Sequence, residues 1–339
     1  MREILVPLAF ALVLAILLNP LVAFLERLRC PQVLAIAVAI IITMIFIIGL
    51  TYFLIMEIKG ISSDWPLYKE KFTLLLNKFQ HFARTDFGIN TKKQNEYITD
   101  AETNLKPILA SAMGTVIGGL AMVILLPVYT FLILYYKKLI LNFLFEIFSE
   151  AKEKEINVVL TQTKGAIQNY MFGILLESII VATLNTIALL ILGVPYAILL
   201  GVFGAILNIL PFIGGILAVL FPILVATATH DGFHTQFWVV ISYIIIQFVD
   251  NHFLVPYIVA SKVKINALVS IVIVLLGGAL WGISGMFLSI PFLGVLKIIF
   301  DRLPEMKPWG ILIGKEVPTK RRGQIIQLRS KKKTAEELN

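Results

Sequence analysis

The sequence predicts an all-α, polytopic membrane protein with two re-entrant helical hairpins in an inverted repeat. Three observations support this fold class. The 339 residues are 58% hydrophobic and only 15% charged, which is far from the balance of a soluble domain. Five apolar runs are long enough to cross a bilayer as helices. Two further apolar stretches are broken by Gly and Pro, so that their limbs fall short of crossing.

The five candidate spans each hold enough apolar residues for a hydrocarbon core about 30 Å thick. They are Ile4–Leu25, Val33–Met56, Met113–Tyr136, Ile167–Leu192 and Phe237–Ile258. Between residues 166 and 296 the charged side chains are few. They are Glu177, Asp231, Asp250, Lys262 and Lys264. A soluble domain of this size could not cover its surface with so few charges.

The two broken stretches cover residues 193–228 and 265–299. The limb Pro195–Asn208 has 14 residues and as a helix reaches about 21 Å, which predicts a hairpin that enters and leaves by one face. Each stretch follows a spanning helix, and the second unit has the opposite orientation to the first. Inverted repeats with paired broken segments are typical of transporters, which place the substrate site at the repeat interface and work by alternating access.

Composition divides the chain into five segments. They are residues 1–56, an N-terminal transmembrane hairpin; 57–112, an extramembrane helical segment; 113–165, a transmembrane helix plus an interfacial amphipathic helix; 166–300, a transport core with two helix-plus-hairpin repeats; and 301–339, a basic cytoplasmic tail. From Lys297 onwards eleven residues are basic and five acidic. In a membrane protein this predicts a cytoplasmic tail in contact with anionic lipids, and not nucleic-acid binding.

Asp250 is the leading candidate for a functional residue, because an ionisable side chain at membrane depth is costly and usually has a role. Gln247, Asp250 and Asn251 follow helical i, i+3, i+4 spacing, which predicts that they share a face. Pro256 lacks an N–H and so leaves the His252 carbonyl free for an ion or ligand. The alternative is that Asp250 lies near a helix end and pairs with a lysine of the following loop.

The same argument applies to Glu177 in the other repeat. The alternative, a buried partner for hydroxyls in a neighbouring helix, fits the sequence equally well, and we expect neutralisation of Glu177 to have the milder effect. Asn208 lies at the tip of the first hairpin, where a helix end exposes unpaired backbone groups. The remaining candidates are Gly and Pro residues that allow close helix contact or bending, or simply pack. They are Pro211, Gly214, Gly215, Gly277, Gly278, Gly282, Gly285 and Pro291.

Signals for catalysis, metals and cofactors are poor, so we expect no enzyme, no metal site and no cofactor. Cys30 is the only cysteine, which excludes an intramolecular disulfide and a multi-cysteine metal site. His230 and His234 flank an Asp-Gly turn signal without a third ligand nearby. No Gly-rich phosphate loop with a lysine follows a strand.

Four segments make the chain resemble the autoinducer-2 exporter family of bacterial membrane proteins. They are residues 18–27 (LNPLV followed by LER), 193–214 (GVPYA through PFIG), Asp250-Asn251 with Pro256, and 277–291 (GG through GISGM to Pro). The family usually carries a further spanning helix before the first one found here. The resemblance implies a homo-oligomer in the bacterial cytoplasmic membrane that exports small polar signalling molecules. Some relatives resemble sodium/proton antiporters.

The sequence therefore predicts a secondary transporter that moves a small polar solute outward, coupled to H+ or Na+. A Na+/H+ antiporter is the alternative, and a non-transporting membrane scaffold is a third possibility. A transporter should need Asp250 or Glu177 for coupling, whereas a scaffold would tolerate their neutralisation.

The charge distribution predicts the topology of the chain. With the tail inside, the loop that carries Lys262 and Lys264 is also inside, and residues 57–106 are outside. In a background without Cys30, a single cysteine replacing Lys333 should react with an impermeant thiol reagent only from the cytoplasm. One replacing Lys92 should react only from outside. External labelling at position 333 would contradict the whole arrangement.

Overall fold

The computed structural model describes residues 2–57, 124–147, 153–210, 214–230, 232–259 and 265–315. Within these ranges every element is helical apart from one isolated β-bridge, between Ile265 and Gly314. Among the described residues, five helices are long and apolar enough to cross a membrane. They are α1 (Arg2–Arg27), Gln32–Glu57, α5 (Glu153–Ile191), α8 with its continuation (His234–Val259) and α10 (Ile283–Arg302). The protein is thus an all-α polytopic membrane protein.

The surfaces of these helices suit a lipid environment. On Gln32–Glu57 large aliphatic and aromatic side chains face outward, and Ile45, Phe46 and Ile48 are each more than 60% exposed. Soluble monomers rarely expose continuous apolar faces of this kind. In lipid, exposure of the same faces carries no free-energy penalty, because the hydrocarbon is as apolar as the side chains.

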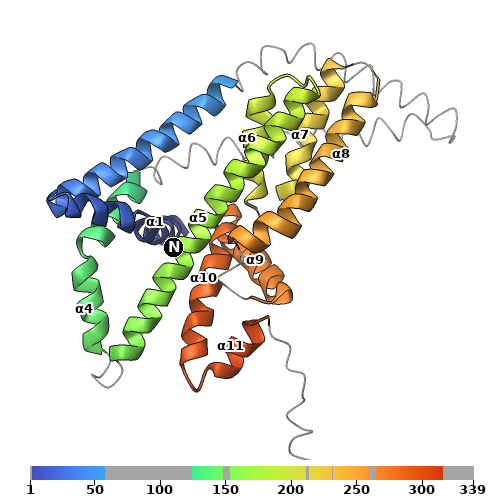
Figure 1. Cartoon of the computed structure of the whole chain (residues 1–339). Helices are drawn as coiled ribbons and strands as arrows, with labels where there is room; N and C mark the ends of the chain where they lie inside the picture. Colours follow the sequence, from blue (N-terminus) through green and yellow to red (C-terminus); the bar gives the residue numbers. More distant parts are fainter. Residues whose placement is uncertain are drawn as a thin grey trace, which may run out of the picture.

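The long helix α5 is the central element of the fold, and Figure 1 shows it running diagonally through the molecule. Its 39 residues correspond to a length of about 58 Å, nearly twice a hydrocarbon core. The sequence predicts a boundary near residue 165, between an interfacial helix and a span. The structure has no break in the helix at this position, because Lys154 to Ile191 form one uninterrupted helix. Only α4 (Lys137–Ile147) is a separate amphipathic helix, bent by 60° from Ile124–Tyr135.

The first broken stretch forms a helical hairpin of α6 (Ala197–Asn208) and α7 (Gly214–Thr229). It packs with α8 against the C-terminal half of α5 around a core that includes Leu189, Leu200 and Val239. Gly193 and Tyr196 have positive φ angles of 68° and 57°, which turn the chain sharply between α5 and α6. The hairpin therefore folds directly back onto the helix that precedes it.

The second broken stretch forms a hairpin of α9 (Ala267–Trp281) and α10. It packs against the N-terminal half of α5, where Leu288 lies in one core with Ile167 and Met171. The two hairpins thus occupy opposite halves of α5 (Figure 1). One expectation about limb length is wrong: α10 has 20 residues, about 30 Å, and is long enough to cross, whereas α6, α7 and α9 are shorter.

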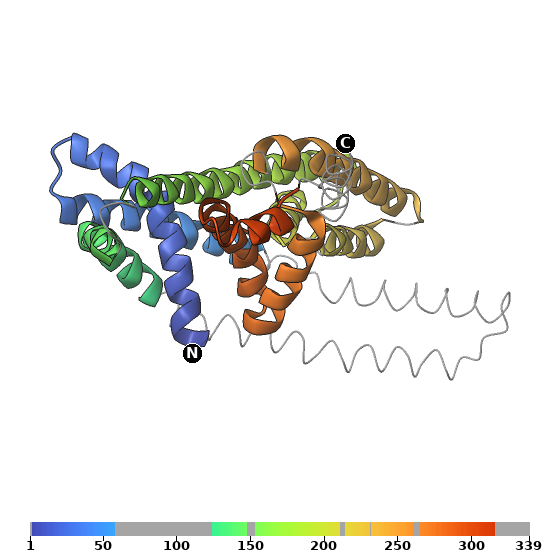
Figure 2. The same ribbon diagram turned by 90° about the horizontal axis from the view of Figure 1, so that it is seen from below.

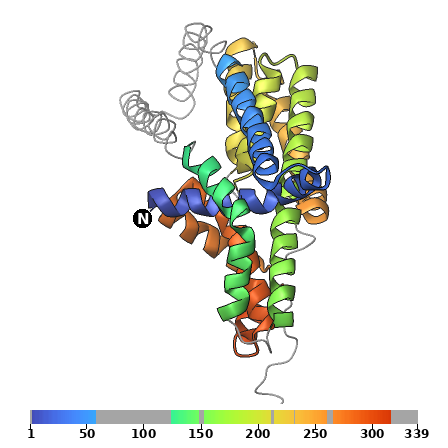
Figure 3. The ribbon, with the colours of Figure 1, turned by 90° about the vertical axis from the view of Figure 1, so that its left-hand side faces the viewer.

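The N-terminal helix α1 crosses α5 steeply instead of running beside it (Figure 3). Gln168 Nε2 on α5 donates to the Ile16 carbonyl at 2.7 Å, and Arg2 Nη2 donates to the Trp281 carbonyl at the end of α9 at 2.9 Å. Seen from below, α1 and the α9–α10 hairpin project to the same side of α5 (Figure 2). α1 therefore makes hydrogen bonds with both α5 and the second hairpin.

The helical structure continues past α10 into the segment that the sequence assigns to the tail. A short helix, α11 (Lys307–Ile313), follows α10. Asn266, which caps α9 by accepting from the Val269 N–H at 3.2 Å, also donates through its side chain to the Leu312 carbonyl at 3.1 Å. The start of α9 is thereby attached to the end of α11.

Close contact between α5 and α6 depends on Gly201. A Cβ atom at this position would overlap the Thr186 hydroxyl and the α5 backbone. We expect Gly201→Ala to lower the apparent melting temperature of the purified protein, with a loss of about 1–3 kcal/mol from overpacking. Gly165→Ala, also within a helix but with no neighbouring atom within 4 Å, is the matched control and should be neutral or slightly stabilising. Equal melting temperatures for the two variants would contradict this account of the contact.

Candidate functional site

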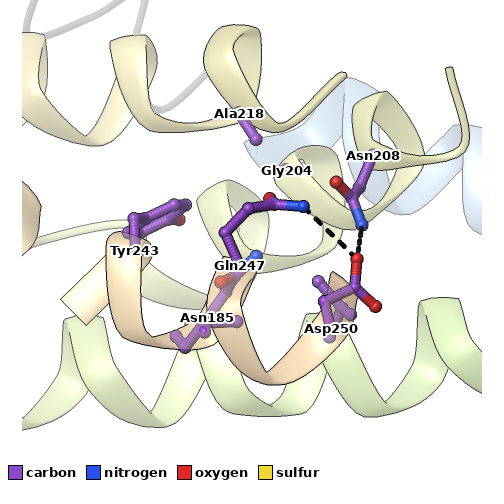
Figure 4. A pocket seen from close by; sticks show the side chains of 9 residues that line it. Asn185, Gly204, Asn208, Ala218, Tyr243, Gln247 and Asp250 are labelled. Carbon is purple, nitrogen blue, oxygen red and sulfur yellow. Dashed lines mark hydrogen bonds between the residues drawn. The ribbon is translucent and has the colours of Figure 1, made fainter. Parts of the chain in front are cut away.

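Two buried carboxyl groups lie close together where α5, α6 and α8 meet, and Figure 4 shows one of them, Asp250, beside Asn208 and Gln247. Glu177 lies on α5 and is 6% exposed, and Asp250 lies at the end of α8 and is 2% exposed. Their side chains are close enough for one amide group to donate to both. Two carboxylates so close together repel one another unless a proton or a cation neutralises part of the charge.

One amide bridges the two carboxyl groups. Asn208 Nδ2, at the last residue of α6, donates to Asp250 Oδ2 at 2.9 Å and to Glu177 Oε1 at 3.3 Å. Gln247 Nε2, one turn before Asp250 on α8, is 3.4 Å from the same Asp250 oxygen (Figure 4). Of the residues predicted from the sequence, Glu177, Asn208, Gln247 and Asp250 therefore come together, although they belong to three helices.

Gly214 and Gly215 begin α7 beside this cluster, and their lack of side chains leaves space for the polar side chains of the cluster. A Cβ atom on Gly215 would overlap the Gln247 side-chain amide, and one on Gly214 would overlap the Leu207 carbonyl and press on Asn208. Neither glycine has a side chain that could bind a ligand. Their contribution is to let the start of α7 approach the polar side chains of α6 and α8.

A small cavity of about 10 Å³ borders the cluster, near the lower limit for a single water molecule. Its lining residues are Val181, Asn185, Gly204, Asn208, Ala218, Tyr243, Ile246, Gln247 and Asp250. Three buried polar atoms of this lining, Asn185 Oδ1, Tyr243 Oη and Asp250 Oδ1, have no hydrogen-bond partner. Unpaired buried oxygens are costly, so these atoms favour a bound water or cation.

The described residues place no positive charge in the cluster. Among the described residues neither Glu177 nor Asp250 forms a salt bridge. The two lysines that the sequence offers as partners for Asp250 lie within 260–264, outside the described residues. A search of the described residues also finds no group of three His, Cys, Asp or Glu side chains that could hold a metal ion. The site therefore consists of two carboxyl groups surrounded by side-chain amides and a phenol.

Asn251 does not join the cluster, although α-helical spacing predicts that it shares a face with Gln247 and Asp250. Its side chain is exposed, because the chain changes from an α-helix to a π-helix (η2, Asp250–Val259) at Asp250. A π-helix pairs residues five apart. The N–H that Pro256 lacks would therefore have reached the carbonyl of Asn251, and not that of His252. π-Helical turns are frequent at functional sites.

The glycines of the second hairpin have a packing role. A Cβ atom on Gly277 or Gly285 would overlap the backbone of the facing helix, and one on Gly278 would meet Met286. Gly282, with φ of 65°, makes the turn between α9 and α10. None of these residues lines the Asp250 cavity. Pro291 lines a different cavity, and Pro211 lies outside the described residues.

Sequence reasoning missed Tyr243 as a site residue. Tyr243, Gln247 and Asp250 follow i, i+4, i+7 spacing on α8, which places them along one face of a helix. This spacing alone could have identified Tyr243 as a neighbour of the other two residues. Asn185 lies two turns beyond Glu177 on α5, and its contact with the cavity could be seen only once α6 was placed. Gly204 of α6 faces both residues, because a Cβ atom there would lie 3.3 Å from Asn185 Nδ2 and 3.6 Å from Tyr243 Oη.

Comparison with known proteins identifies relatives along almost the whole chain. The family profile of the AI-2E family transporters matches residues 1–305. The AI-2 transport protein TqsA of Escherichia coli (strain K12) is 26% identical over 317 residues, which cover 92% of this chain and 89% of TqsA. The YrrI protein of Bacillus subtilis (strain 168) is 24% identical over 317 residues, covering 90% and 88% of the two chains. The match extends over both helix-plus-hairpin units and includes the carboxylate cluster, and the chain belongs to the AI-2E family of membrane transporters.

Proposed function

We propose that this transporter is a cation-coupled secondary transporter in which Asp250 and Glu177 together bind one H+ or Na+ in each cycle. The observation that carries the proposal is the buried pair of carboxyl groups bridged by Asn208. Within the described residues no positive side chain neutralises this pair. Ionisable groups at membrane depth that face one another mark ion and proton pathways.

The chemistry of the pair calls for a cation. Two negative charges so close that one amide donates to both repel strongly in a medium of low dielectric constant, and burying them without a partner costs several kcal/mol. A shared proton would turn the repulsion into a carboxyl–carboxylate hydrogen bond. A sodium ion would instead use the carboxylate oxygens together with the amide and phenol oxygens of the cavity, since it prefers hard oxygen ligands.

The fold suggests how cation binding could drive alternating access. Asn208 belongs to the first helix-plus-hairpin unit and Asp250 to the second, so their hydrogen bond joins the two units. Protonation or ion binding at Asp250 would weaken or redirect that hydrogen bond, because it reduces the negative charge on the accepting oxygens. The equilibrium between two packings of the hairpin on α5 would then depend on cation occupancy, which is the requirement for coupled transport.

The transported solute, in this proposal, is a small polar molecule that moves outward across the cytoplasmic membrane. The support comes from the family and from TqsA, which is named for transport of AI-2. Re-entrant insertion of the two hairpins and assembly into a homo-oligomer belong to the same proposal. The exposed apolar faces are compatible with contact to lipid or to a second copy.

Na+/H+ antiport is a second candidate, favoured by one specific observation. The cavity beside Asp250 has a volume of only about 10 Å³, so in this conformation it admits a water molecule or a bare cation but no organic solute. Na+/H+ antiport needs a site no larger than this, because its only substrates are Na+ and H+. Proteoliposomes with an internal pH reporter distinguish the two candidates, because an imposed sodium gradient alone drives proton flux only in an antiporter.

We expect Asp250→Asn to reduce cation-coupled flux in proteoliposomes to the level of protein-free vesicles. Asn keeps the size and hydrogen bonding of Asp but cannot carry the cation. The sequence predicts a milder effect for Glu177→Gln. Since Glu177 accepts from the same Asn208 amide, we now expect a loss of similar size for both variants.

The matched control for these variants is Glu155→Gln, which removes a carboxylate from an exposed position on the same helix as Glu177. It should leave flux unchanged at equal protein density. Full cation-coupled flux in Asp250→Asn would refute the proposed role of the pair. A scaffold without transport activity would show no flux in any of the proteins, including the wild type.

Asn208→Ala tests the bridge itself. It removes the amide donor to both carboxyl groups, and we expect a stability loss of about 1–3 kcal/mol together with uncoupled or abolished flux. Asn169→Ala, at an exposed position of α5, serves as control for loss of an asparagine. If Asn208→Ala transports with normal coupling, the bridge is a packing contact and does not link cation binding to movement.

A further inference from the structure

A second and much larger cavity lies away from the carboxylate cluster, and the proposed function does not use it. Its volume is about 580 Å³, within the range of about 300–1,000 Å³ typical of ligand pockets. It is an open cavity lined by α1, Ile124–Tyr135, α4, α5 and α10, and it shares no lining residue with the Asp250 cavity. Figure 3 shows α4 beside the first half of α5, below the level at which α1 crosses.

Two lysines are the only charged residues among the described residues that line this cavity, Lys137 at the start of α4 and Lys164 on α5. Lys137 Nζ donates to Asn19 Oδ1 of α1 at 2.7 Å. Partial burial, and then repulsion from Lys164, lower the pKa of Lys137, against a weaker opposing effect of Glu26. Two ammonium groups that repel one another beside a cavity without a carboxylate attract an anion.

The other lining residues divide by polarity between the helices. Those contributed by α1, Ile124–Tyr135, α4 and α10 are apolar apart from Asn19 and Lys137. The apolar members are Leu12, Val13, Ala15, Ile16, Ile133, Leu134, Ile140, Leu141, Leu144, Phe145, Pro291, Phe292 and Val295. Towards the start of α5 the lining includes the polar residues Asn157, Thr161 and Thr163. A ligand that fits this pattern has an anionic head and a hydrocarbon tail.

We propose that this cavity binds one anionic phospholipid, with its phosphate between Lys137 and Lys164 and an acyl chain in the apolar part. Basic pockets between transmembrane helices are suited to anionic lipid head groups. Pro291 of α10 takes part as a wall of the acyl-chain site. This site is independent of the carboxylate pair, and it differs from lipid contact at the basic tail because its residues belong to the folded helical core.

Native mass spectrometry of the full-length protein in detergent tests the proposal, with phosphatidylglycerol, phosphatidylcholine and inorganic phosphate as probes. We expect one tightly bound phosphatidylglycerol per chain, weaker binding of phosphatidylcholine, and no displacement by millimolar phosphate. The double variant Lys137→Gln/Lys164→Gln should weaken phosphatidylglycerol binding roughly tenfold or more. Lys138→Gln/Lys154→Gln removes two exposed lysines from the same two helices and should leave the binding unchanged.

Leu144→Trp provides an independent test of the tail site, since it fills the cavity without changing charge, and it should also reduce lipid occupancy. Equal binding of the two lipids, or equal losses in the two lysine double variants, would overturn the proposal. Displacement by inorganic phosphate would show that only the phosphate is recognised, and would overturn the acyl-chain site. Unchanged lipid binding together with a changed oligomeric state would identify the cavity as a contact between copies of the chain instead.

Discussion

The burial of two carboxyl groups between apolar helices is the constraint on which the centre of this structure depends. Glu177 and Asp250 lie on different helices, and the amide of Asn208 on a third helix is the donor that both share. An unsatisfied buried carboxylate is costly, so α6 must end close to both. Gly201 and Gly204 bring α6 against α5, and Gly215 lets α7 begin beside Gln247. Much of the local glycine content follows from the need to satisfy two acids.

The length of α5 explains how two hairpins can contact one helix without obstructing each other. The first hairpin packs on its C-terminal half, while α10 and α1 pack on its N-terminal half. Glu177 lies between these regions. A change in the hydrogen bonds at Glu177 therefore acts at the boundary between two packed units, where a small shift alters the position of one unit relative to the other.

The sequence was sufficient for the fold class and for the identity of the acidic residues, because hydrophobic run length and the scarcity of charges are local signals. Glu177 and Asp250 stand out for that reason. Their contact could not be predicted, since it joins residues far apart in the chain through the crossing of α5, α6 and α8. The exposed position of Asn251 could not be predicted from the sequence either, because no local pattern indicates that the helix changes to π geometry at Asp250. The continuity of α5 through residue 165 could not be predicted either, because apolar periodicity does not separate an interfacial helix from the extension of a span.

The geometry also limits which part of the protein can move during transport. The second hairpin is held rigidly, because Gly277 and Gly285 bring the backbones of α9 and α10 into direct contact, and Asn266 attaches α9 to α11. The first hairpin is joined to α5 by a short turn in which Gly193 and Tyr196 both have positive φ. A bulky residue in the left-handed region is strained and persists only where its surroundings hold it there. If cation binding releases the Asn208 bridge, the resulting motion of α6 and α7 should be taken up at this turn, and the second hairpin should move as a unit.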